Sequence, residues 1–206
     1  MSEPEPVPQL GPRQALQERV AAAIIAAAAR ALVEHGEHAS MADVATAAGV
    51  ARATVYRYFP SREALLAEVA KLAVGDAGER LASARIGEVP PEEGVSRAVR
   101  ALTDAGDPFI VLVRERVQPS PHEFEDAVAQ PLRHLFERGQ AAGTFRDDIS
   151  TAWLVEALIG LMASVLSAKP RLGREDTTAA IASLFLEGAR AHREPDGRSP
   201  EWRPNR

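Results

Sequence analysis

The chain contains no cysteine among its 206 residues. This absence excludes disulfide bonds, zinc–thiolate sites, iron–sulfur clusters and thiol nucleophiles. Hydrophobic residues nevertheless make up 46% of the sequence, which is enough to build a packed core. A chain that is disordered throughout is therefore excluded.

Long hydrophobic runs are also absent. No apolar stretch reaches the roughly 20 residues that a membrane-spanning helix needs, and the longest candidate, residues 153–166, contains Glu156. The first residues, MSEPEPVPQLGPR, are acidic and rich in proline, which is unlike a signal peptide. We therefore expect a soluble protein of the cytoplasm that has no membrane partner.

Basic residues are outnumbered, and the formal net charge is -5. Indiscriminate coating of nucleic acid depends on many phosphate neutralisations, so this charge argues against it. One segment, ARATVYRYFPSR at residues 51–62, has the opposite sign, because it holds three arginines and no acidic residue. Any nucleic-acid site should therefore be local, and this segment is the candidate.

Strand signals are scarce, and the helix signals predict an all-α protein. Capping residues, glycines and prolines delimit the expected helices, with a short one between Ser40 and Gly49. The other helices are expected over about 13–35, 51–59, 61–75, 91–106, 107–118, 121 to 139 or 143, 150–168 and 174–192. The apolar run FIVLV at residues 109–113 is read as buried helix because it follows Asp107-Pro108 and continues into RERV.

Two short helices joined by a glycine turn predict a helix-turn-helix. Ser40 and Asp43 have the spacing of a capping box, and Gly49 permits the left-handed backbone of the turn. In the second short helix, Val55 and Phe59 lie one turn apart and can anchor it, which leaves its other face for the major groove. The groove-facing set is Arg52, Ala53, Thr54, Tyr56 and Tyr58.

The stretch SMADVATAAGVARATVYRYFPSREALL, residues 40–66, resembles the DNA-binding signature of the tetracycline-repressor (TetR) family of bacterial transcriptional regulators. The resemblance is strong over about residues 16–69 and architectural beyond them. It implies an N-terminal helix-turn-helix domain and a larger helical domain that binds a ligand and dimerises. We therefore expect a DNA-binding domain at residues 13–60, a connecting helix at 61–75, and a ligand-binding and dimerisation domain at 76–193. Residues 1–12 and 194–206 are expected to be disordered tails.

The resemblance also implies roles for individual residues in binding double-stranded operator DNA. Arg52 and Ala53 would read bases. Thr54, Tyr56 and Tyr58 would contact the DNA backbone, and Tyr56 is also placed to touch a base. Arginine can bond guanine at two points, small apolar groups can touch a thymine methyl, and hydroxyls can reach phosphate oxygens.

Three further residues of the segment have less specific roles. The resemblance makes Ser40 a phosphate contact, and Arg62 stands where the family usually has lysine, which preserves a phosphate contact. Arg57 occupies a variable position. It is as well explained by solvent or by an intramolecular partner as by DNA.

An unknown small-molecule effector, largely apolar, is implied for the C-terminal helical domain. The aromatic and apolar residues there could line a chamber, and one of Arg114, Glu115 and Arg116 could point inward and meet an anionic group. The competing explanations are ordinary core packing and a surface ion-pair cluster. The candidate ligand-binding residues are Phe109, Val113, Arg114, Phe124, Val128 and Trp153.

The helix expected at residues 150–168 is apolar on nearly every side, so it needs burial on several sides. Paired with the last helix, it is a candidate for the four-helix bundle of a homodimer, as the resemblance implies. Burial within one subunit is the alternative. The candidate dimer residues are Leu158, Met162, Val165, Ile181 and Phe185.

Together these features predict a ligand-released transcriptional repressor that is not an enzyme and has no metal or cofactor. Motifs of serine hydrolases, phosphate-binding loops and zinc proteases are missing from the sequence. His35 and His38 straddle the end of a helix with no further ligand near them in the sequence. The remaining alternative is a helix-turn-helix protein that binds DNA or a partner constitutively, which would have a filled chamber.

Overall fold

The protein is all-α, as the sequence predicts. The computed structural model describes residues 11–114, 119–168 and 172–191. Within these ranges the backbone forms helices and turns, and the only β feature is an isolated bridge between Phe145 and Arg190. The predicted disordered tails, 1–12 and 194–206, lie outside the described residues except for Gly11, which caps the first helix, and Pro12, which begins it.

The chain divides into two compact units. One contains Met1–Gly78 and Asp104–Glu125, and the other contains Glu79–Thr103 and Asp126–Arg206. The sequence-based boundaries at residues 60, 75 and 193 stay a prediction. The division shows that the apolar segment at residues 109–113 packs with the N-terminal helices.

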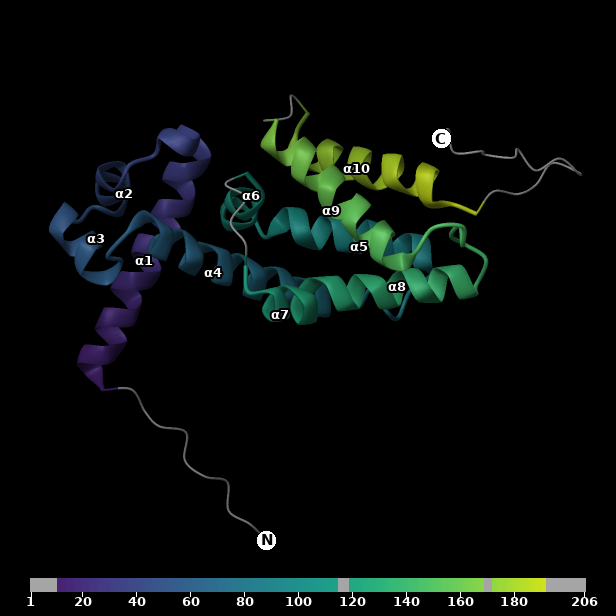
Figure 1. Cartoon of the computed structure of the whole chain (residues 1–206), viewed down its shortest axis with the longest axis horizontal. Coiled ribbons are helices and arrows are strands. Elements are labelled where there is room, and N and C mark those ends of the chain that lie inside the picture. The colour runs from purple at the N-terminus through teal and green to yellow at the C-terminus, as the bar shows by residue number, and fades with distance from the viewer. Residues whose placement is uncertain (1–10, 115–118, 169–171, 192–206) are drawn as a thin grey trace, which may run out of the picture. The chain divides into compact units, whose positions relative to one another are not determined.

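The N-terminal unit begins with the long helix α1, Pro12–His35, followed by the short 3-10 turn η1, Gly36–His38. Two short helices come next, α2 at Met41–Ala48 and α3 at Arg52–Tyr58, and they lie beside α1 (Figure 1). The division between the units falls within α4, Arg62–Ser83. The remaining helices of this unit are α6, Asp107–Arg114, and α7, Pro121–Phe124.

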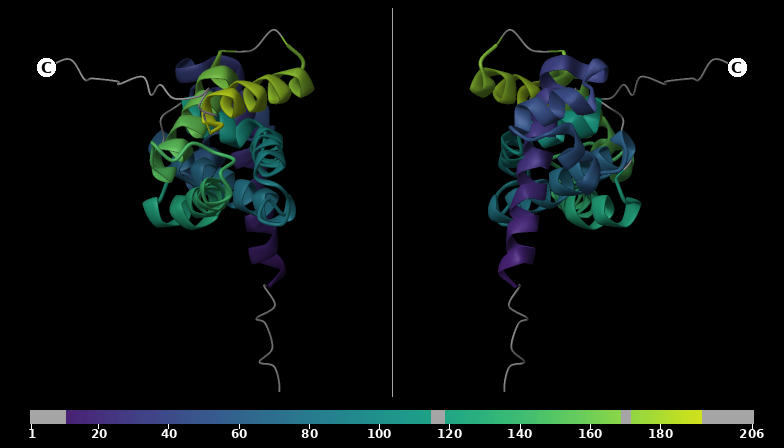
Figure 2. Two further views of the ribbon diagram at one scale, coloured as in Figure 1. Left: turned by 90° about the vertical axis from the view of Figure 1, so that its right-hand side faces the viewer. Right: turned by 90° about the vertical axis from the view of Figure 1, so that its left-hand side faces the viewer.

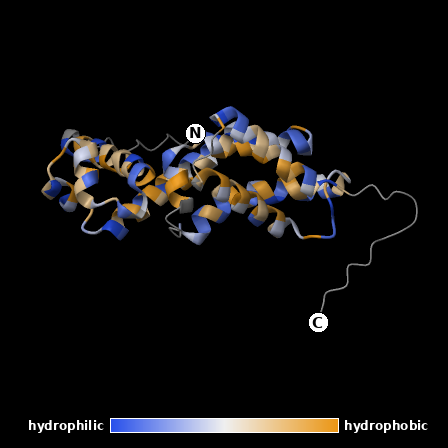
Figure 3. Cartoon of the chain, turned by 90° about the horizontal axis from the view of Figure 1, so that it is seen from above, coloured by the Kyte–Doolittle hydropathy of each residue, from blue (hydrophilic) through white to orange (hydrophobic). Residues whose placement is uncertain are grey.

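One hydrophobic core joins these helices. Ile24 of α1, Val55 of α3 and Val69 of α4 are fully buried in it. Val111 of α6 belongs to the same cluster, which confirms that the FIVLV run is a buried helix. Hydrophobic and hydrophilic residues alternate around the helices in Figure 3, so most helices present one apolar side to a core.

The C-terminal unit is a helical bundle. Its helices are α5, Pro91–Asp104, α8, Gln130–Ala141, α9, Thr151–Ser167, and α10, Arg174–Ala189. Helix α9 packs against both α8 and α10, and Figure 2 (left) looks nearly along α5 and α8. The ring of Phe136 meets those of Phe145 and Phe185, with centroids 5.7 and 5.6 Å away.

Two predicted helix boundaries are wrong. Gly75 does not end α4, which continues to Ser83 because Ala77 and Leu81 extend its buried stripe. The single helix predicted after Pro121 is interrupted by a π-helical turn, η2, at Glu125–Ala129. Pro131 follows that turn, and a proline inside a helix has no N–H to donate and crowds the carbonyl four residues before it. The wider π turn relieves this crowding.

In the part of the chain that the structure describes, no helix combines the length and the hydropathy that a transmembrane span requires.

Gly139 of α8 generates a stability prediction, because a Cβ atom there would lie 2.1 Å from a ring carbon of the buried Phe145. Gly139→Ala should lower the free energy of unfolding by about 1–3 kcal/mol, the usual cost of overpacking a core. Gly75→Ala is the matched control, since a Cβ there meets nothing within 4 Å. The control should be neutral or stabilising because alanine favours helix over glycine. Urea denaturation followed by circular dichroism measures both; equal stability of the two variants would contradict the packing.

Candidate nucleic-acid interface

The start of α2 is fixed by a reciprocal capping box, as predicted. The backbone N–H of Asp43 donates to Ser40 Oγ at 3.2 Å, and the backbone N–H of Ser40 donates to Asp43 Oδ2 at 2.8 Å. The Ser40 hydroxyl also donates to Asp43 Oδ2, at 2.7 Å. Two of the N–H groups that a helix start leaves unpaired are thus satisfied, so the orientation of α2 is well defined.

The turn between the two short helices depends on Gly49. Its φ of 66° and ψ of 29° lie in the left-handed region, where a side chain is strained. Its N–H donates to the carbonyl of Thr46, and the N–H of Val50 donates to that of Ala45. This is the helix end that the sequence predicts, and only residues 49–51 separate α2 from α3.

The anchoring face of α3 also agrees with the prediction. Val55 is fully buried and Phe59, just after the helix, is 5% exposed. Val50 and Tyr58 are partly buried and pack against the same core. The seven-residue helix α3 therefore has one apolar side fixed to the N-terminal unit, which leaves the opposite side for solvent or a partner.

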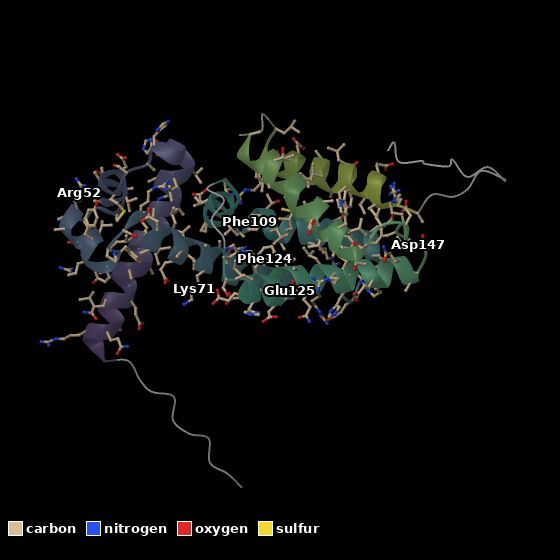
Figure 4. The ribbon with its side chains drawn as sticks, viewed as in Figure 1. Arg52, Lys71, Phe109, Phe124, Glu125 and Asp147 are labelled. Atoms are coloured by element: carbon tan, nitrogen blue, oxygen red, sulfur yellow. The ribbon has the colours of Figure 1, made fainter. Side chains whose placement is uncertain are left out.

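The opposite side carries most of the predicted DNA-binding residues. Arg52, Ala53, Tyr56 and Arg57 are exposed, while Thr54 is half-buried. Figure 4 labels Arg52 at the start of α3. The surface includes basic, hydroxyl and small apolar groups and no acidic group over residues 51–62, which is the composition needed for phosphate and base contacts.

Arg52 and Tyr56 contact each other across one turn of α3. The Arg52 Nη2–H donates to the Tyr56 hydroxyl at 3.2 Å. The guanidinium carbon also lies 5.4 Å from the centre of the Tyr56 ring, within cation–π range. The hydrogen bond to Tyr56 raises the pKa of Arg52 above its ordinary value.

Arg57 and Tyr58 form a second arginine–tyrosine contact, with the Arg57 guanidinium carbon 5.3 Å from the ring centre. The Tyr58 ring packs partly against the core, so it is less available than Tyr56. Arg62, in the first turn of α4, is half-buried. The structure thus brings Ser40, Arg52, Tyr56 and Arg57 to exposed positions in one unit, and their DNA contacts stay predictions.

The predicted ligand-binding residues are divided between the two units. Phe109 is buried and Phe124 half-buried in the N-terminal unit, on α6 and α7 (Figure 4). Val128 is buried in the C-terminal unit, where Trp153 is 56% exposed on α9. The side chains of Val113 and Arg114 lie outside those described. This set of residues stays a prediction.

A groove in the C-terminal unit was not predicted from the sequence. It has a volume of about 440 Å³ and lies between α5 and α10. Ion pairs join its walls, because Arg100 bonds Glu175 at 3.1 Å and Arg190 bonds Glu92 at 2.8 Å. These partners are 75 and 98 residues apart, so no local sequence signal could reveal them. Every arginine of the groove has a carboxylate partner, so its positive charges are already paired within the chain.

The residues predicted for the dimer interface stay a prediction, and most of them are buried within one chain. Leu158, Met162 and Ile181 are fully buried within one chain and Phe185 is 7% exposed, so these side chains have almost no surface to give to a second copy. Val165 is half-buried. The large apolar residues exposed on α9 and α10 are instead Trp153 and Leu184, at 56% and 64%. An almost wholly apolar sequence such as that of α9 does not reveal which face of the helix is buried.

A metal centre has no support in the described part of the chain. No group of three or more histidine, aspartate and glutamate side chains there is arranged to hold an ion. Near His35, the carboxylate of Asp43 is engaged in the capping box.

Comparison with known proteins points to the same class of protein. Residues 24–69 match the family model described as bacterial regulatory proteins of the tetR family. The transcriptional repressor LfrR of Mycolicibacterium smegmatis is 28% identical over 177 residues, which cover 84% of this chain and 91% of that protein. The transcriptional regulator NfxB of Pseudomonas aeruginosa is 25% identical over 174 residues, or 81% and 92% of the two chains.

The crystal structure of LfrR in complex with proflavine is similar to most of this chain. Its TM-score is 0.69 at 25% identity, and the match covers 84% of this chain and 97% of that one. The second helix of the helix-turn-helix has one side buried in the core and an exposed side that is basic. Together with these similarities, this arrangement is that of a DNA-binding transcriptional regulator. Over residues 24–69 the chain matches the tetR family of bacterial regulatory proteins, and most of its length is similar to the TetR-like regulator LfrR.

The capping box generates a prediction on pH. Hydrogen bonds from the Ser40 side chain and then the Ser40 backbone lower the pKa of Asp43 below its ordinary value. A lowered folded-state pKa stabilises the fold above the unfolded pKa, and this contribution is lost as the pH falls through the folded pKa. Asp43→Asn should therefore flatten the fall in unfolding free energy below about pH 4. Chemical denaturation at several pH values measures it, and parallel curves for the two proteins would show that the cap does not depend on charge.

Proposed function

We propose that the chain is a homodimeric repressor that binds operator DNA through α3 and is released by a small molecule bound in its C-terminal helical domain. The observation that carries the proposal is the two-sided character of α3. Val55 is fully buried below it, and Arg52 and Tyr56 are exposed above it. In this proposal Arg52 and Ala53 read bases, and Ser40, Thr54, Tyr56, Tyr58 and Arg62 contact the DNA backbone.

A local site is consistent with the overall charge of -5. Long-range attraction to DNA is weak for an acidic protein, so affinity has to come from the short basic segment and from base contacts. Two copies of such a segment, placed one or more helical turns apart, gain affinity from simultaneous binding. A homodimer with two half-sites meets that requirement.

For the dimer we propose the solvent sides of α9 and α10. Trp153 and Leu184 are large apolar residues on those sides, and Gly160 and Gly188 are exposed glycines of the same helices. A Cβ at either glycine would meet nothing within 4 Å, so a second chain could approach the backbone there closely. The large side chains project from the helices and the glycines leave hollows. In a symmetric dimer, the projecting residues of one copy could fill the hollows of the other.

For the release step we propose that the effector favours a different arrangement of the core that holds α3. Val111 of α6 shares this core with α1 and α3, so a shift of α6 would repack the residues beneath Val55. The effector has to bind the released state better than the DNA-bound state, with a coupling of about 1–3 kcal/mol. LfrR is bound to proflavine in one crystal structure, so proflavine is the first compound to test.

The DNA-binding proposal predicts the effect of Arg52→Ala. The operator is taken as the duplex that the full-length protein enriches from a random pool, and fluorescence anisotropy compares it with a scrambled duplex. Loss of a two-point guanine contact should weaken operator binding by about 10- to 100-fold, or 1–3 kcal/mol. Binding to the scrambled duplex should change little and stay salt-sensitive.

Arg100→Ala is the matched control, because this exposed arginine of α5 is paired with Glu175. It should leave affinity for both duplexes unchanged. Equal loss on both duplexes in Arg52→Ala would show that Arg52 contributes only charge, and the proposed base reading would then be wrong.

The dimer proposal predicts the effect of Leu184→Glu. In a symmetric dimer this change places a charge in the apolar interface on both copies. It should raise the dimer dissociation constant by at least tenfold, or about 1.4 kcal/mol. Leu16→Glu is the control, since Leu16 is also exposed, at 56%, but lies on α1. Sedimentation equilibrium measures both. A dimer of unchanged strength in Leu184→Glu would remove α10 from the interface.

A further inference from the structure

The exposed pair formed by Arg52 and Tyr56 has a more specific consequence than two separate DNA contacts. We propose that Tyr56 is a positioning residue that orients the Arg52 guanidinium for base reading and joins it to a backbone contact through one hydroxyl group. This inference rests on the proposed function, because it concerns how the same surface discriminates between DNA sequences.

The geometry restrains Arg52 at two points. Its Nη2–H donates to the Tyr56 hydroxyl at 3.2 Å, and its guanidinium carbon lies 5.4 Å from the Tyr56 ring centre. An exposed arginine otherwise samples many rotamers, and ordering it on DNA costs conformational entropy. A partner one helical turn away lowers this cost before DNA arrives.

The hydroxyl of Tyr56 can serve two partners at once. A phenol has one hydrogen to donate and oxygen lone pairs to accept. Arg52 uses an acceptor site, so the O–H hydrogen of Tyr56 stays available for a phosphate oxygen. A series of hydrogen bonds would then link the base to Arg52, Arg52 to Tyr56, and Tyr56 to the phosphate. This series would fix the distance between the base that Arg52 reads and the phosphate that Tyr56 contacts.

The second tyrosine of α3 provides a built-in comparison. Tyr58 also lies beside an arginine, with Arg57 5.3 Å from its ring centre. Its ring packs partly against the core, and the contact joins consecutive residues, which leave a helix in different directions. Tyr58 therefore lacks the positioning role, and only Tyr56 should depend on Arg52.

A double-mutant cycle on the full-length protein tests this dependence. Arg52→Ala, Tyr56→Phe and the double variant are compared on the operator duplex enriched from a random pool and on its scrambled form. We expect Tyr56→Phe to weaken operator binding about fivefold more in the presence of Arg52 than in its absence. The coupling should vanish on the scrambled duplex. Tyr58→Phe should weaken binding to both duplexes equally and show no coupling to Arg52→Ala.

Two results on DNA would overturn the proposal. Additive effects of Arg52→Ala and Tyr56→Phe would make Tyr56 an independent backbone contact. Tighter operator binding by Tyr56→Phe would show that the pair holds Arg52 away from the base and has to break on binding.

A measurement without DNA separates failure of this inference from failure of the proposed function. Side-chain NMR of free protein should show slower rotation of the Arg52 Nη groups in the wild type than in Tyr56→Phe, with matched thermal melts confirming the fold. Equal rotation would overturn the positioning role. If no duplex is enriched from the pool, the proposed function fails, and the NMR comparison alone decides whether Tyr56 orients Arg52.

Discussion

The burial of Val55 is the constraint on which the DNA-binding surface depends. Seven residues make an α-helix too short to be stable alone, so α3 takes its position from the core beneath it. Val55 and Phe59 share that core with α1, α2, α4 and Val111 of α6. The capping box of Ser40 and Asp43 fixes where α2 begins, and Gly49 fixes the turn into α3. Together they determine which residues are left outside: Arg52, Ala53, Tyr56 and Arg57.

Because α6 packs into this core, residues that are far apart in the sequence are in one cluster. Val111 lies more than 50 residues after Val55 in the sequence, yet both are buried in one cluster. A helix that packs against the N-terminal core can influence α3 without touching DNA, because tightly packed interiors transmit small displacements. In the proposed release step, the same core that positions α3 would transmit a displacement of α6 to it.

Local signals made the N-terminal half predictable. The capping spacing at Ser40, the glycine at 49 and the one-turn spacing of Val55 and Phe59 each act within a few residues, and the structure has all three. Pro131 was a local signal that was overlooked, and it explains the π turn that interrupts the predicted helix. The buried face of α9 could not be predicted, because apolar residues surround that helix and only its neighbours determine that Leu158 is buried and Trp153 exposed. The pairing of Arg190 with Glu92 depends on tertiary structure in the same way.

The central claim is that a short basic surface on an acidic chain carries the DNA contacts. Amide hydrogen exchange of the full-length protein, with and without an enriched duplex, tests this most directly. The account predicts slower exchange around Ser40 and through α3 to the start of α4, with the amides of α5 and the outer side of α10 unchanged. Protection confined to helices of the C-terminal unit, with α3 unaffected, would contradict it.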